Sequence, residues 1–272
     1  MKYCNRECQI AHRSQHKKEC KKRAAELHDE KLFKQPSSTE DCPICFLLLP
    51  TLNSGSTYFT CCGKTICSGC VYAPVYDDQG NKVNKKKCPF CRTPAPRTDE
   101  EVIRNEKKRA EANDPIAIYN LGVEYRDGTN GYPQDYTKAL ELWHRAGKLG
   151  FADSYLNIGY TYELGQGVEV DKKKALHYFE LAAMMGNAVA RYNLGIKEEE
   201  EGNMERALKH HMIAVRCGYS PSLKQIKELY SNGYATKEDY TKALQSYQVY
   251  LSEIKSDQRD EAAAADEGNR YY

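Results

Sequence analysis

Residues 135–150, which read DYTKALELWHRAGKLG, decide the fold that we expect for this chain. Three similar segments follow at 171–186, 203–218 and 238–253. When the four are aligned, one alanine recurs at separations of 36, 32 and 36 residues: Ala139, Ala175, Ala207 and Ala243. A period of this length is typical of solenoids built from pairs of helices. The sequence therefore predicts a mainly α fold, an α-solenoid of about four helix-pair repeats over residues 113–254.

Local signals mark where these helices begin and end. Residues that can cap a helix start stand at the head of three segments: Asp135, Asp171 and Asn203. Glycines that can adopt a left-handed conformation close the same segments: Gly150, Gly186 and Gly218. A partner helix is expected before each segment, and three of these partners contain an interior glycine: Gly122, Gly159 and Gly195. Because glycine weakens a helix, we expect these three to permit close helix crossing.

The repeats resemble a known family. LGVEYRDG (121–128), IGYTYELGQGVEVDKKKA (158–175) and YNLG (192–195) resemble Sel-one-like repeats, which are related to the tetratricopeptide fold. The resemblance covers residues 113–254; the third copy lacks the glycine loop, and the fourth has Lys227 where the others have glycine. It implies stacked helix pairs with a continuous core and a curved surface that binds a protein or peptide partner.

Cysteines crowd the first third of the chain. Eleven of the twelve precede residue 92, in short pairs, which favours metal ligation over disulfides. Three pairs have the two-residue spacing that places two thiolates on one tetrahedral zinc: Cys42 and Cys45, Cys67 and Cys70, Cys88 and Cys91. The adjacent Cys61 and Cys62 lie where a fourth pair is required. The pattern therefore predicts eight sulfurs for two zinc ions, and so small zinc-stabilised finger domains at the N-terminal end of the α-solenoid.

These pairs resemble the RING finger family, on DCPIC (41–45), CCGKTICSGC (61–70) and KCPFCR (87–92). The resemblance covers residues 41–96 and implies that the first and third pairs hold one zinc ion while the second and fourth hold the other. Lys64 stands where the family has histidine, and a protonated amine is a poor ligand. We therefore predict that both Cys61 and Cys62 bind the second ion. The alternative is a three-cysteine site completed by water or an outside residue.

A closed structural zinc site performs no chemistry, so any activity must come from the surface that it shapes. In the RING family this surface binds a ubiquitin-conjugating enzyme, and the resemblance makes Ile44, Pro89 and Arg92 candidates for that contact. It implies a ubiquitin-protein ligase with no catalytic residue of its own. The alternative is a non-enzymatic adaptor for protein–protein interaction.

The N-terminal stretch YCNRECQIAHRSQHKKEC (3–20) carries a further candidate metal set, Cys4, Cys8, His16 and Cys20. Three residues separate the members of each pair, so each pair can face one side of a helix. The pattern resembles the second half of a MYND finger, with Arg13 near the usual position of a tryptophan. Three interpretations stay open: part of a longer finger, a lone third zinc site, or a basic helix with incidental cysteines.

Composition sets the remaining expectations. The net charge of +2 and 29% charged residues give no reason to expect nucleic-acid binding. The first residues lack the apolar core of a signal peptide, and the longest apolar stretch, 45–52, is too short to span a bilayer, so we expect an intracellular protein, cytoplasmic or nuclear, without membrane insertion. The expected organisation is a partial MYND-like finger (1–23), a linker (24–40), a RING-type finger (41–96), a charged linker (97–112), the repeats (113–254) and a charged tail (255–272).

Overall fold

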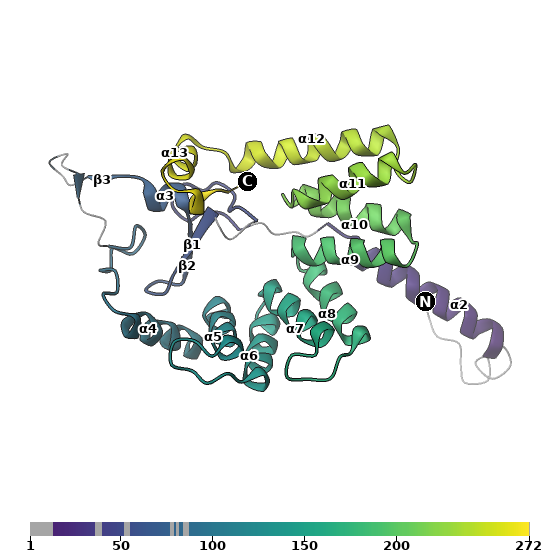
Figure 1. Ribbon diagram of the computed structural model, residues 1–272, viewed down its shortest axis with the longest axis horizontal. Coiled ribbons are helices and arrows are strands. Elements are labelled where there is room, and N and C mark those ends of the chain that lie inside the picture. The colour runs from purple at the N-terminus through teal and green to yellow at the C-terminus, as the bar shows by residue number, and fades with distance from the viewer. Residues whose placement is uncertain are drawn as a thin grey trace.

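A computed structural model describes residues 13–35, 40–51, 55–76, 79, 82–83 and 87–271. An arc of paired helices curves around one side of the molecule, and a small cysteine-rich unit lies between the two ends of the arc (Figure 1). We call the paired helices the array and residues 41–96 the finger. The mainly α, paired-helix architecture that the sequence predicts is confirmed.

The array consists of consecutive helix pairs. They are α5 (Pro115–Asp127) with α6 (Tyr136–Lys148), α7 (Ala152–Leu164) with α8 (Lys172–Met184), α9 (Ala188–Glu200) with α10 (Met204–Arg216), and α11 (Pro221–Ser231) with α12 (Lys237–Ile254). Helix α4 (Asp99–Glu111) precedes the first pair, and α13 (Asp257–Ala265) and the short helix η2 (Glu267–Asn269) follow the last. Among the described residues, no helix is both long and apolar enough to cross a bilayer.

Side-chain caps start most of the array helices, as expected. Asp135 accepts a hydrogen bond from the Lys138 amide, and Asp171 accepts from the amides of Lys173 and Lys174. Asn203 is different, because its side chain makes no cap hydrogen bond at the start of α10. Its amide group donates instead to Glu198 and Glu201, two carboxylates at the end of the preceding helix. The expected cap at Asn203 is therefore wrong, because its side chain is oriented toward these two carboxylates and not toward the free amides of α10.

The interior glycines do permit close helix crossing. A Cβ atom on Gly122 would lie 2.5 Å from Nε1 of Trp143, and one on Gly159 would lie 2.6 Å from Cδ1 of Phe179. In the third pair, a Cβ atom on Gly195 would lie 2.5 Å from Cε1 of a fully buried histidine. In these three pairs the first helix therefore uses its glycine to receive a ring from the second helix, whereas α11 in the fourth pair has no glycine.

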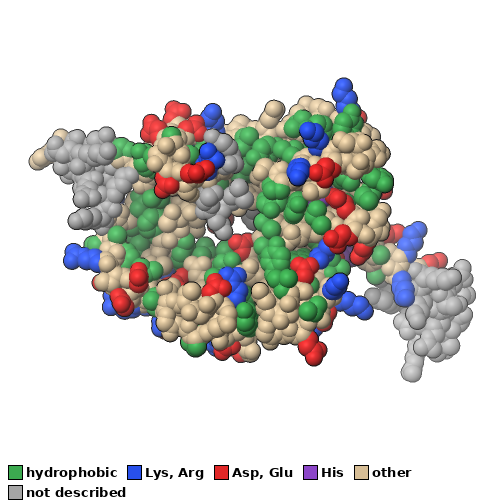
Figure 2. Space-filling model, viewed as in Figure 1, with side chains coloured by type: hydrophobic (Ala, Val, Ile, Leu, Met, Phe, Trp, Pro, Cys, Tyr) green, Lys and Arg blue, Asp and Glu red, His purple; other side chains and the backbone are tan. Residues whose placement is uncertain are grey.

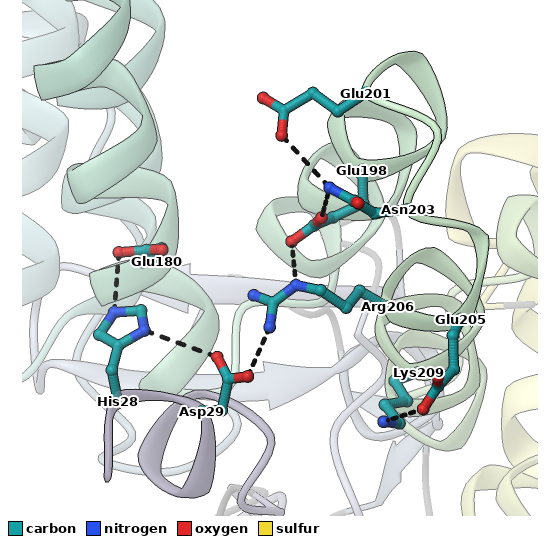
Figure 3. A network of polar contacts seen from close by, with 9 residues as sticks. All are labelled: His28, Asp29, Glu180, Glu198, Glu201, Asn203, Glu205, Arg206 and Lys209. Carbon is teal, nitrogen blue, oxygen red and sulfur yellow. Dashed lines mark hydrogen bonds and ion pairs between the residues drawn. The ribbon is translucent and has the colours of Figure 1, made fainter. Parts of the chain in front are cut away.

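The N-terminal helix α2 (Arg13–Leu32) docks on the array through its last turn. Leu32 is 1% exposed and joins the core around Phe179, and Asp29 forms an ion pair of 2.6 Å with Arg206 on α10. His28 lies 3.2 Å from Glu180 on α8 (Figure 3). The first part of the linker expected at 24–40 is thus helical as far as Leu32. Its last turn attaches α2 to the middle of the array.

Two further segments also differ from their expected character. The charged linker expected at 97–112 is mostly helix α4, which Thr98 caps by accepting from the Glu101 amide. The charged tail expected at 255–272 contains α13, which packs against the finger helix α3 (Ser68–Tyr72). Tyr271, near the chain end, is only 2% exposed. Each helix buries one charged residue and one alanine, Glu106 and Ala110 on α4 and Arg259 and Ala262 on α13, which composition by itself does not reveal.

The finger contains two small antiparallel ribbons around α3. Strand β1 (Ser56–Phe59) pairs with β2 (Lys64–Cys67), with Ser56 opposite Cys67 and Phe59 opposite Lys64. Strand β3 (Val75–Tyr76) pairs with β4 (Lys82–Val83). The first ribbon carries the turn that holds the adjacent cysteines at 61 and 62. It therefore sets the position of one of the candidate metal groups.

Candidate metal centres

The first cysteine pair lies on a tight backbone knuckle. The amide of Cys42 donates to the carbonyl of Leu47 at 2.9 Å, and the amide of Phe46 donates to the carbonyl of Cys42 at 2.9 Å. Phe46 adopts a positive φ of 58° to complete the turn. This conformation brings the side chains of Cys42 and Cys45 to the same side of the loop.

The last pair repeats this knuckle. The Cys88 amide donates to the Thr93 carbonyl at 2.8 Å, and the Arg92 amide donates to the Cys88 carbonyl at 3.0 Å. Arg92 has a φ of 63°, close to that of Phe46 in the first knuckle. Two segments 46 residues apart thus share one conformation because they share the motif Cys-Pro-X-Cys followed by a left-handed residue.

The other two pairs lie on the ribbon and the helix that follows it. Cys61 and Cys62 occupy the turn between β1 and β2, where Gly63 has a φ of 67° and donates its amide to the Phe59 carbonyl at 2.8 Å. Cys67 ends β2 and Cys70 lies in α3. The continuous segment from the β1–β2 turn to α3 therefore contributes two cysteines to each of two separate groups.

The folded chain gathers eight cysteines into two groups of four, and within each group all sulfur atoms lie within 4.8 Å of one another. The first group contains Cys42, Cys45, Cys67 and Cys70, and the second contains Cys61, Cys62, Cys88 and Cys91. The structure thus brings the first and third pairs together, and the second and fourth pairs together. The exposed Lys64 belongs to neither group.

The donor set and its spacing fit zinc. Four sulfurs at 2.3 Å from a tetrahedral ion lie about 3.8 Å apart, and thiolate-only donors select zinc over hard cations such as magnesium or calcium. Three sulfur–sulfur distances are close to this value: 3.7 Å for Cys45 and Cys67, 3.8 Å for Cys62 and Cys88, and 3.4 Å for Cys61 and Cys91. A disulfide needs about 2.05 Å, so these are separate thiols with room for an ion between them.

The sulfur atoms also influence one another's protonation. Contact with the Cys67 thiol lowers the pKa of Cys42 to about 4, whereas burial raises the pKa of Cys70 to about 12. In the second group the Thr93 hydroxyl lowers the pKa of Cys91 to about 6, and burial raises the pKa of Cys61. A bound divalent cation stabilises every sulfur as a thiolate. All four sulfurs of a group can then be deprotonated together, in spite of these opposite pKa shifts.

The candidate enzyme-contact residues lie on the knuckles. Ile44 is 36% exposed at the tip of the first knuckle, and Arg92 is exposed at the end of the second. Pro89 is half-buried and lines a shallow, mostly apolar groove with Phe59 and Val71. Ile44 does not line this groove. Two exposed aromatic rings that sequence reasoning did not single out, Phe46 and Phe90, stand on the same knuckles at 77% and 42% exposure.

The N-terminal metal set falls mostly outside the description. Cys4 and Cys8 lie outside the residues that the structure describes, and His16 lies in α2 without a described side chain. Cys20 is exposed on α2. The third zinc site therefore stays a prediction.

Two arginines that the sequence gave no reason to select contact the metal-binding segments. Arg109 on α4 reaches the turn that carries Cys61, and Arg259 on α13 reaches the loop that carries Cys45. Each is one positive residue in a strongly charged helix, so no local pattern could have marked it.

Comparison with known proteins identifies the array. The Sel1 repeat model matches residues 115–151, 152–187 and 228–245, so the chain contains Sel1 repeats, which mediate protein–protein interaction. The match leaves out the pair formed by α9 and α10, although this pair has the same glycine-and-ring packing as the first two.

Relatives cover parts of the chain. An "ERAD-associated E3 ubiquitin-protein ligase component HRD3B" from Arabidopsis thaliana is 29% identical over 115 residues, which are 41% of this chain and 18% of that one. An "E3 ubiquitin-protein ligase GW2" from Oryza sativa subsp. indica is 34% identical over 73 residues, 26% of this chain and 15% of that one. The matched part is thus about a fifth or less of these relatives' lengths. A crystal structure of a Sel1 repeat protein from Oxalobacter formigenes shares 28% identity, with a TM-score of 0.47, over 64% of this chain and 67% of that one.

Proposed function

We propose that the finger is a RING-type unit that binds a ubiquitin-conjugating enzyme, and that the array holds a protein substrate or a member of a ligase complex. The observation that carries the proposal is the arrangement of the two zinc-binding knuckles, whose tips remain exposed although the finger is packed against both ends of the array. Ile44, Phe46 and Phe90 offer apolar side chains to a partner there. Apolar side chains exposed together on a small rigid unit are typical of a protein contact.

The proposed mechanism requires no nucleophile in this chain. The conjugating enzyme carries ubiquitin as a thioester, and the finger increases the rate at which a substrate lysine attacks it by holding the two in a productive orientation. Arg92 supplies a planar guanidinium that can donate to two carbonyl groups at once, one on each bound protein. Arg92 follows the last cysteine of its group in a left-handed conformation, and its side chain is exposed.

The array supplies the second half of the proposal. Sel1 repeats bind protein partners, and on the face in Figure 2 hydrophobic side chains lie along the inner side of the arc. Two of the relatives are named as a ligase component and a ligase, which supports a role in ubiquitin transfer. A partner held by the array would lie close to the conjugating enzyme held by the finger, because the finger fills the gap between the array ends.

The test is discharge of thioester-linked ubiquitin to free lysine, measured with a panel of conjugating enzymes and the zinc-loaded full chain. We expect acceleration by at least one enzyme, and we expect Arg92→Ala to reduce it about tenfold or more while the zinc content stays the same. Arg97→Ala is the matched control, since Arg97 is an exposed arginine five residues away. If no enzyme is accelerated by a folded, zinc-loaded chain, the function is that of a non-enzymatic adaptor.

A further inference from the structure

The C-terminal helix places a buried arginine against the first metal group. Arg259 on α13 is 0% exposed, and its Nη1 donates to the carbonyl of Leu48 at 2.8 Å and to that of Ile254 at 2.6 Å. Its Nη2 lies 3.5 Å from the Leu47 carbonyl and 3.9 Å from the sulfur of Cys45. This guanidinium therefore lies directly behind the knuckle that supplies two of the four sulfurs.

Helix α13 packs closely against the segment that carries Cys67 and Cys70. A Cβ atom on Gly69, between Cys67 and Cys70, would lie 2.8 Å from both Cγ and the backbone nitrogen of Arg259. The hydroxyl of Ser68 donates to the carbonyl of Asn269 at 3.3 Å. Only a glycine at position 69 lets α13 approach the metal-binding segment so closely.

Charge is the feature that requires explanation. Among the described residues, the hydrogen-bond partners of Arg259 are carbonyl oxygens and a sulfur, and no carboxylate forms an ion pair with it. A buried cation without a counter-charge costs several kcal/mol. Four thiolates around one zinc ion carry a net charge of −2, so the loaded metal group supplies the missing counter-charge.

An arginine from the opposite end of the array supports the second metal group in a different way. Arg109 on α4 donates through Nε to the carbonyl of Thr60 at 3.1 Å and through Nη2 to the carbonyl of Cys61 at 2.8 Å. The hydroxyl of Tyr58 on β1 donates to Asp114, the cap of α5, at 2.8 Å. These contacts hold the turn in which two adjacent cysteines point toward one group.

We propose that Arg259 and Arg109 are positioning residues of the two metal groups, and that zinc loading of the finger thereby closes the array into a ring. Each end of the array is tied to one metal group, and the finger bridges the gap between them (Figure 1). Zinc stabilises the docked position of α13 through Arg259, and docked α13 retains zinc by the same free energy, because coupling between two binding events is reciprocal. Loss of zinc releases the ends of the array.

The first experiment measures zinc release to the chromogenic chelator 4-(2-pyridylazo)resorcinol from the full chain. Replacement of a residue that orients or supports metal ligands commonly changes metal affinity 10–100-fold. We expect Arg259→Met to release one zinc equivalent at least about tenfold faster than the native chain and the second at the native rate. Arg270→Met is the matched control, since Arg270 is an exposed arginine near α13 that forms an ion pair with the exposed Glu267.

Alkylation by N-ethylmaleimide, followed by mass spectrometry of peptides, identifies which group has lost its ion. In Arg259→Met we expect early modification of the first group, Cys42, Cys45, Cys67 and Cys70, and in Arg109→Met of the second group, Cys61, Cys62, Cys88 and Cys91. Arg259→Lys keeps the positive charge and is expected to restore most of the zinc retention. Equal acceleration at both groups in Arg259→Met, or equal losses in the Met and Lys variants, would overturn the proposal.

The second experiment measures hydrogen–deuterium exchange of α13, residues 257–265, with and without zinc. We expect exchange in the native chain to rise at least tenfold when zinc is removed, while exchange in α7 and α8 at the middle of the array stays unchanged. In zinc-loaded Arg259→Met, α13 is expected to exchange as fast as in the zinc-free native chain. Zinc-independent protection of α13 in the native chain would refute the coupling. None of these measurements uses ubiquitin transfer, so they succeed or fail independently of the proposed ligase activity.

Discussion

Replacement of Glu106 by glutamine should stabilise the protein in a manner that depends on pH. Glu106 on α4 is 6% exposed and faces Glu124 on α5, which is 8% exposed. The pKa of Glu106 is raised from 4.5 to about 7: burial is the largest cause, a hydrogen bond from Asn120 opposes it, and the charge of Glu124 adds to it. Glu124 already accepts a hydrogen bond of 2.8 Å from Asn130.

The sign follows from proton binding. Between pH 4.5 and 7 the folded chain keeps the Glu106 proton that the unfolded chain loses, so the free energy of unfolding decreases as pH rises through this window. With 1.36 kcal/mol per pKa unit, ionisation of Glu106 costs about 1 kcal/mol at pH 5.5 and about 3 kcal/mol at pH 8. Glutamine is neutral at both pH values, so its advantage should be about 2 kcal/mol larger at pH 8.

Thermal unfolding of the zinc-loaded chain at pH 5.5 and pH 8 measures this difference. For a chain of this size we expect the melting temperature of Glu106→Gln to exceed that of the native chain by roughly 5–10 °C at pH 8 and by much less at pH 5.5. Glu111→Gln, an exposed substitution at the end of the same helix, should show no such pH dependence. An equal gain at both pH values, or a loss of stability at pH 8, would refute the reasoning.

Three further predictions concern the buried core and the metal groups. Arg191 is fully buried, and none of its side-chain nitrogens has a hydrogen-bond partner within the described part of the chain, so Arg191→Met should raise the free energy of unfolding by about 1–4 kcal/mol in denaturant titrations; a decrease would mean that the guanidinium is paired. Gly159→Ala should lower it by about 1–3 kcal/mol, since the new Cβ would lie 2.6 Å from Phe179; a gain, as helix propensity alone predicts, would contradict the close crossing. In native mass spectrometry we expect Cys217→Ser to retain two zinc ions and Cys61→Ser to hold one tightly, and two firmly held ions in the second variant would show that Cys61 is not a ligand.

Further hydrogen bonds hold the finger against the array. Besides the two arginines, the amide of Thr51 donates to the Tyr250 hydroxyl at 2.8 Å, and the Thr51 hydroxyl donates to the Cys217 carbonyl. These contacts join the finger to α10 and α12. A substrate bound by the array would therefore be held at a fixed distance and orientation from an enzyme bound by the finger. A mechanism based on orientation requires this.

The local part of this structure could be predicted from the sequence. The recurring alanines gave the helix pairs, and the interior glycines at 122, 159 and 195 gave the places where the two helices of a pair cross closely. The spacing of the cysteines predicted eight sulfurs for two ions, and the resemblance to RING fingers implied the two groups of four that the structure brings together. These features are readable because helix periodicity and short ligand spacings depend on residues that are near one another in the chain.

Only the tertiary structure decided how these parts are joined. Arg259 contacts Leu48 across 211 residues, and Tyr58 contacts Asp114 across 56. Composition made α4 a charged linker and α13 a charged tail, because the charges on their exposed faces outnumber the few side chains that they bury. The choice of partner for such a face depends on which surfaces the folded array brings within reach. No local pattern records that choice, and so the ring and its two arginines are properties of the folded chain.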